Sequence, residues 1–191
     1  MGKITWNGGA LLAPVPAVMV SCGDGERDNI ITVAWTGIIS TNPPKTYISV
    51  RPSRYSYDII KKTGEFAINL TPSSLVKTAD YCGMYTGKKV DKFAKYSLTK
   101  EKASKISCPL IGECPISLEC RVTDVVPLGS HDMFIADVVA VDVDEALIGE
   151  GGRLHISRAK LSAFAHGEYF ELGRRIGKFG FSVKKSKKER K

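Results

Sequence analysis

The sequence predicts a mainly β protein, an antiparallel barrel with short inserted helices. Apolar stretches of strand length recur along the chain, and Asp24-Gly25 is a turn signal between the first two of them. The regular alternation of strands and long helices that builds a parallel sheet is missing. The 191 residues fit one domain, which we place at residues 1–183, followed by a basic tail at 184–191 that we expect to be disordered.

The first three strands are expected from their apolar content. VPAVMVSC at 15–22 is followed, after the turn, by a strand at 29–40 that is apolar nearly throughout. The segment TYISV at 46–50 alternates, with its first, third and fifth side chains on one face, as strands do.

Two short helices are expected between the strands. SYDIIKK at 56–62 predicts a helix that Gly64 ends, and EFAINL at 65–70 predicts the next strand. A second helix is expected after TPSS, with Ser73 or Ser74 as its N-cap and an inner stripe at helical spacing. That stripe consists of Leu75, Thr78, Ala79 and Cys82.

The most regular strand pattern lies at 116–123, where apolar residues alternate with Ser117, Glu119, Arg121 and Thr123. The turn or loop PLGSHD then leads into a return strand at 133–144. Strands joined in this way by hairpins favour an antiparallel arrangement.

Charge and hydropathy indicate where in the cell the protein is expected. The net charge is +8, but the last eight residues hold six Lys/Arg and one Glu, so residues 1–183 carry only +3. A tail of this kind can contact nucleic acid or anionic lipid, or can simply keep the chain soluble. Two prolines in ALLAPVPAVMVSC favour a strand over a signal segment, and no apolar run approaches membrane-spanning length. We therefore expect a cytoplasmic protein without membrane contact.

Several kinds of site find no support in the sequence. There is no GxGxxG after a strand, no GxxxxGK[ST] and no GxSxG. The spacing of His131, His155 and His166 does not fit a metal site, and the five cysteines include no CxxC pair. We expect no metal site, and cysteines that are reduced and mostly buried.

The loop RPSRYS, between the strand at 46–50 and the first helix, is rich in donors. Its donors are Arg51, Ser53, Arg54 and Ser56. Backbone N–H groups at a helix start, together with hydroxyl and guanidinium groups, favour an anion, most often phosphate. Lys92 could add a charge. The alternative is a capped loop facing solvent.

Trp35 also allows two interpretations. In an apolar strand it is either a core residue or, beside a phosphate pocket, a wall for a flat ring. The residues alone leave this open.

Four blocks in fixed order carry a resemblance to a known family. They are NIITVAWTGIISTNPP, TYISVRPSRYSYDIIKKTGEFAINL, TGKKVDKF and CPISLECRV. Together they resemble the flavin reductase-like family, more narrowly its flavoredoxin-like members, over roughly residues 12 to 170. The resemblance implies an FMN-binding split barrel, and a homodimer of six-stranded barrels with FMN near the interface.

The resemblance also implies the cofactor-binding residues. Positions matching the family's flavin contacts are Asn29, Trp35, Ser56, Lys92, His131 and Phe164. Ser53 and Ser56 correspond to the phosphate loop, where Arg54 would assist, and the backbone of Trp35-Thr36 would lie along the flavin ring. The family commonly has Thr at the position of Ser56, and Ser keeps the hydroxyl donor. No catalytic residue of the protein is expected, since direct hydride transfer needs none.

The function implied is an FMN-dependent oxidoreductase that receives hydride from NAD(P)H or electrons from a redox partner protein. A pure electron carrier is the close variant. Two other possibilities are a nucleic-acid-binding module that uses the basic tail, and a split-barrel protein that binds haem or a pyridoxal compound instead. Against nucleic acid, the body shows no basic stripe with interleaved aromatic residues.

Overall fold

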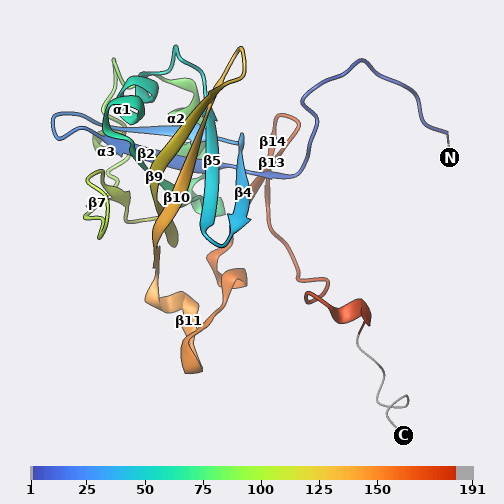
Figure 1. Cartoon of the computed structure of the whole chain (residues 1–191). Helices are drawn as coiled ribbons and strands as arrows, with labels where there is room; N and C mark the ends of the chain where they lie inside the picture. Colours follow the sequence, from blue (N-terminus) through green and yellow to red (C-terminus); the bar gives the residue numbers. More distant parts are fainter. Residues whose placement is uncertain (1, 184–191) are drawn as a thin grey trace, which may run out of the picture.

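A computed structural model describes residues 2–183, and it confirms a mainly β fold built on an antiparallel sheet (Figure 1). Seven strands lie in the order β3-β2-β6-β9-β10-β5-β4. Their bounds are β2 (Val18–Gly23), β3 (Asp28–Val33), β4 (Thr36–Thr41), β5 (Pro44–Val50), β6 (Glu65–Leu70), β9 (Ile116–Pro127) and β10 (Asp132–Val143). The predicted basic tail at 184–191 lies outside the described residues.

The strand predicted at 29–40 is two strands, β3 and β4, which lie at opposite edges of the sheet. Val33 pairs with Val18 of β2, whereas the carbonyl of Trp35 accepts a hydrogen bond from the Ser49 amide of β5 at 2.9 Å. The chain therefore passes from one edge to the other within two residues, and the sheet curls into a barrel here. An apolar run cannot reveal this break, because both strands are apolar.

The barrel interior is one apolar core, closed by helix α1 (Tyr55–Thr63). Phe66 and Phe134 from the sheet are fully buried there, together with Ile59 and Ile60 from the helix. Gly64 ends α1 as predicted: it adopts φ 69°, and its N–H donates to the Ile60 carbonyl at 2.8 Å.

Helix α2 (Val76–Met84) packs on the outer side of β2 and β3. Thr78, Ala79 and Cys82 of the predicted stripe are buried, but Leu75 lies in a preceding 3₁₀ turn, Ser73–Leu75. The predicted N-cap is wrong, because neither serine caps the helix with its side chain. The Ser73 hydroxyl donates instead to Glu171 at 2.5 Å.

A second, three-stranded sheet stands beside the barrel, in the order β1-β13-β14. It joins β1 (Val15–Pro16) to the hairpin of β13 (Ser162–Ala165) and β14 (Glu168–Glu171), seen behind β4 in Figure 1. Its strands bring the C-terminal part of the chain next to the beginning of β2.

The remaining elements are short. They are α3 (Lys92–Lys95), β7 (Lys100–Glu101), β8 (Leu110–Ile111), β11 (Ile148–Gly149), β12 (Arg153–Leu154) and 3₁₀ turns at Glu145–Leu147, Glu150–Gly152, Ile156–Ala159 and Phe181–Val183. The segments 2–14 and 173–183 run away from the barrel and are mostly exposed, and the second ends in the 3₁₀ turn Phe181–Val183 (Figure 1). Within the part of the chain that the structure describes, no helix is long and apolar enough to cross a membrane.

Candidate functional site

Two neighbouring cavities lie where the loop before α1 meets α2, the end of β3 and the β13–β14 hairpin. We name them after one residue each: the Ser56 compartment has a volume of about 300 Å³ and the Trp35 compartment about 370 Å³. Ile31, Arg51 and Arg54 line both, so the two compartments lie next to each other.

The Ser56 compartment collects five of the nine residues predicted from the sequence. These are Asn29, Ser53, Arg54, Ser56 and Lys92. Ser56 lies in the first turn of α1, and Asn29 comes from β3; their side chains are buried, and Asn29 Nδ2 donates to Ser56 Oγ at 2.8 Å. The start of α1 adds the N-terminal N–H groups and dipole of a nine-residue helix.

Lys92 brings a buried cation to this compartment. Its Nζ donates to the Ile30 carbonyl at 2.6 Å and to the Cys82 carbonyl at 2.7 Å. Burial lowers the pKa of Lys92 to about 8; the Cys82 thiol opposes this shift, and the charge of Arg54 adds to it. An ammonium has three N–H donors, so one remains for a ligand.

Gly87 belongs to the same compartment, and no sequence pattern singled it out. A Cβ at this position would lie 2.2 Å from Asn29 Oδ1 and 2.6 Å from a ring carbon of Tyr55. The close approach needs glycine, because any side chain would displace Asn29 or Tyr55. The sequence TGKK is typical of an ordinary turn, and only the folded structure shows that Gly87 lies against Asn29 and Tyr55.

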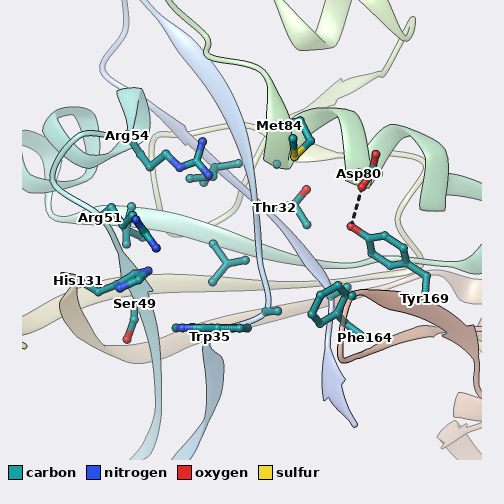
Figure 2. Close-up of a pocket in the computed structure, with 17 residues that line it drawn as sticks. Thr32, Trp35, Ser49, Arg51, Arg54, Asp80, Met84, His131, Phe164 and Tyr169 are labelled. Carbon is teal, nitrogen blue, oxygen red and sulfur yellow. Dashed lines mark hydrogen bonds between the residues drawn. The ribbon is translucent and has the colours of Figure 1, made fainter. Parts of the chain in front are cut away.

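Two exposed guanidinium groups, Arg51 and Arg54, stand at the junction of the compartments (Figure 2). Within residues 2–183 neither forms an ion pair with a carboxylate. His131 lines the Trp35 compartment beside them, and its pKa is lowered by burial and by the charges of Arg51 and Arg54. This end of the site therefore attracts anions.

The Trp35 compartment gathers three further predicted residues, Trp35, His131 and Phe164, from distant parts of the chain. Figure 2 shows the Trp35 ring edge-on between His131 on one side and Phe164 on the other. Trp35 is 42% exposed, so it is a wall of the cavity and not a core residue. Phe164 reaches this place because β13 pairs with β1.

The side of the compartment opposite the arginines contains Asp80 of α2 and Tyr169 of β14, which the sequence did not single out (Figure 2). Tyr169 Oη donates to Asp80 Oδ1 at 3.2 Å. Burial and the neighbouring Asp80 raise the pKa of Tyr169 to about 12.

Thr36 is the one predicted residue that lines neither compartment. It follows Trp35 at the start of β4, where its hydroxyl donates to the Tyr47 carbonyl at 2.5 Å. Its side chain therefore completes the strand pairing of β4 with β5.

The arrangement suits a ligand with an anionic group at one end and a flat ring at the other. Hydroxyl, amide and cationic donors surround the Ser56 compartment, while Trp35 and Phe164 flank the other one. Among the described residues, no group of three or more His, Cys, Asp or Glu side chains could hold a metal ion.

Comparison with known proteins shows which family the chain belongs to. The family model described as Flavin reductase like domain matches residues 11–172. Flavoredoxin of Desulfovibrio vulgaris (Miyazaki F) superposes with a TM-score of 0.89 at 31% identity, over 96% of this chain and 100% of that chain. Flavoredoxin from Methanosarcina acetivorans superposes with a TM-score of 0.85 at 26% identity, over the same shares.

A curated relative at lower similarity is the NADPH-flavin oxidoreductase of Streptomyces viridifaciens. It is 27% identical over 146 residues, which cover 74% of each chain. The match of the family model over most of the sequence, together with the shared split-barrel fold, settles the classification. The chain belongs to the flavin reductase-like domain family, a family of flavin-related oxidoreductases, and it is similar to flavoredoxin.

Proposed function

We propose that this protein is an FMN-binding flavoprotein that passes electrons from NAD(P)H, or from a protein donor, to an acceptor. The observation that carries the proposal is the adjacency of the two compartments. A donor-rich pocket suited to a phosphate shares three lining residues with a cavity flanked by Trp35 and Phe164, which suits an isoalloxazine ring.

The Ser56 compartment fits the phosphate end of FMN. The Ser56 hydroxyl already accepts from Asn29, so its own proton remains available to a phosphate oxygen. Arg54 can add bidentate hydrogen bonds, and Lys92 has one free ammonium hydrogen. Gly87 keeps this side of the compartment open, because a side chain there would push Asn29 into it.

The Trp35 compartment fits the ring end. Trp35 and Phe164 offer apolar faces and edges to a flat ring, and His131 supplies a hydrogen-bonding nitrogen at the arginine side. Bound FMN would supply the electron chemistry itself, while the protein orients the ring, tunes its surroundings and limits the access of water.

A comparison of FMN with riboflavin, which lacks the phosphate, tests this proposal. The wild-type protein is expected to retain oxidised-flavin absorption bands after excess FMN is removed, and to bind FMN more tightly than riboflavin. In Arg54→Gln we expect FMN affinity to fall about tenfold, the value of one charged hydrogen-bonding group, and riboflavin affinity to stay unchanged.

Arg153→Gln, which removes an exposed arginine on β12, is the matched control and should bind both flavins as the wild type does. A wild-type protein that stays colourless with FMN would refute the proposal, and bands of haem or of a pyridoxal compound would redirect it. Rapid mixing of the flavin-loaded protein with NADH and with NADPH separates the two variants of the function. In a reductase the absorption of the bound flavin bleaches with one of the nucleotides, and in a carrier it does not.

A further inference from the structure

The β13–β14 hairpin forms one wall of the Trp35 compartment. Phe164, Gly167 and Tyr169 of this hairpin all line the cavity. At the open end of the hairpin, Ser162 N donates to the Thr71 carbonyl at 2.9 Å, and Glu171 accepts the Ser73 hydroxyl at 2.5 Å. The base of this wall is therefore fixed to the segment that precedes α2.

Nearer its tip the hairpin is tied to α2 by a side-chain contact at one side of the cavity, between Tyr169 and Asp80 (Figure 2). Tyr169 donates its hydroxyl hydrogen to Asp80 Oδ1 at 3.2 Å. A tyrosine hydroxyl is protonated at neutral pH, and burial and Asp80 raise the pKa of Tyr169 further, to about 12, so the donor persists. The contact is long and lies near the surface, so we assign it the strength of one ordinary hydrogen bond.

The same tyrosine also sets the position of Phe164. The two residues are direct cross-strand partners in the β13–β14 pairing. Their ring centroids lie 5.4 Å apart at an interplanar angle of 67°, an edge-to-face contact. A tyrosine held by Asp80 therefore holds the phenylalanine that faces Trp35 across the compartment.

We propose that Tyr169 and Asp80 are positioning residues that latch the β13–β14 hairpin onto α2, and that this latch fixes Phe164 and sets how long a flavin stays bound. The effect on flavin rests on the proposed function, whereas the latch itself rests on the geometry of the hairpin. Neither residue takes part in electron transfer.

The flavin dissociation rate of variants with conservative changes tests the latch. Tyr169→Phe keeps the aromatic contact with Phe164 but removes the hydroxyl, and we expect FMN to dissociate about fivefold faster. Asp80→Ala should have the same effect. FMN should dissociate from the double variant no faster than from either single variant, because both changes remove the same contact. Asp80→Asn keeps an acceptor oxygen, so FMN should dissociate from it nearly as slowly as from the wild type.

Tyr81→Phe is the matched control, because it makes the same chemical change as Tyr169→Phe, on the helix that carries Asp80. Tyr81 stacks on Tyr85 at 4.2 Å and does not line the Trp35 compartment, so the rate should stay that of the wild type. A wild-type rate in Tyr169→Phe, or additive effects of Tyr169→Phe and Asp80→Ala, would overturn the inference.

Amide hydrogen exchange in the flavin-free protein provides a readout that does not depend on FMN. Loss of the latch should speed exchange in residues 163–170 in Tyr169→Phe, whereas Tyr81→Phe should leave it unchanged. If the wild type retains no FMN but the hairpin loosens as expected, the proposed function fails and the latch stands. If FMN binds but neither dissociation nor exchange responds, only the latch fails.

Discussion

Lys92 illustrates how the fold prepares a single side chain for an anion. Its ammonium is buried against two backbone carbonyls, from Ile30 and Cys82, that compensate only part of the lost hydration. Its pKa falls to about 8, chiefly through this burial. Between pH 8 and the ordinary lysine value near 10.5 the unfolded chain binds the proton and the folded chain does not, so this group makes stability rise with pH in that window.

The same shift predicts a pH dependence of cofactor binding. A phosphate is attracted by the charged form of Lys92, so FMN affinity should fall as the pH rises through about 8. Fluorescence titrations with FMN between pH 7 and 9 measure this. In Lys92→Met the affinity should be lower at pH 7 and nearly flat over this range, whereas exposed Lys89→Met should follow the wild type. Equal slopes for wild type and Lys92→Met would contradict the assignment.

Among single residues, the sequence predicted the binding donors where they lie close together in the chain. The RPSRYS loop shows its cations and hydroxyls in six consecutive residues, and the structure places all four predicted donors, Arg51, Ser53, Arg54 and Ser56, around the Ser56 compartment. Asp80, Gly87 and Tyr169 were missed because their place in the site is a product of tertiary contact. His131 and Phe164 rested on the family resemblance, since a lone histidine in a loop and a phenylalanine in an apolar stretch carry no signal of their own.

Among the elements, β9 departs most from its sequence pattern. The alternation at 116–123 holds, but Ser117 and Glu119 on the polar side are buried. Glu119 accepts four hydrogen bonds, from the amides of Ser104, Lys105 and Ile106 and from the Ser104 hydroxyl. Burial alone would raise the pKa of this carboxyl, but these hydrogen bonds lower it. A loop that covers the outer face of a strand leaves no periodic signal, because its contacts are irregular.

Glu119 should therefore be important for stability. In Glu119→Ala three amides and a hydroxyl lose their acceptor, and we expect a loss of at least about 3 kcal/mol in the free energy of unfolding. Glu113→Ala, which removes an exposed acceptor of the Thr99 amide and hydroxyl, should cost only about 1 kcal/mol. Urea denaturation of both variants measures the difference, and equal losses would show that the loop at 104–106 finds other partners.

At the scale of the whole molecule, several large apolar side chains are exposed. Ile38 on the edge strand β4 is 83% exposed, and Trp6, Leu12 and Phe179 lie exposed on the two extended terminal segments. Such surface is typical of an interface, and we propose that it is covered by a second copy of the chain. The homodimer expected from the sequence is consistent with this distribution, and it stays a proposal.

Sedimentation equilibrium tests the dimer. The wild type should sediment with twice the mass of one chain, and Ile38→Asp should raise the dimer dissociation constant at least tenfold, because it places a charge in an apolar contact. Leu128→Asp, in the exposed β9–β10 turn, is the control and should leave the mass unchanged. A wild-type protein that sediments as a monomer would refute the proposed dimer.

The antiparallel barrel was predictable from hairpin signals and apolar runs and its split-barrel type from the family resemblance, whereas the switch between β3 and β4 was not predictable. That switch has a consequence for folding. The two strands are separated by two residues in sequence, yet five strands of the sheet lie between them. The β2–β3, β4–β5 and β9–β10 pairings are local, but their union must wait for the β2–β6, β6–β9 and β5–β10 pairings, which join distant parts of the chain and form slowly. We expect the barrel to close late on the folding pathway, and Trp35, at the point of closure, to acquire its native surroundings only then.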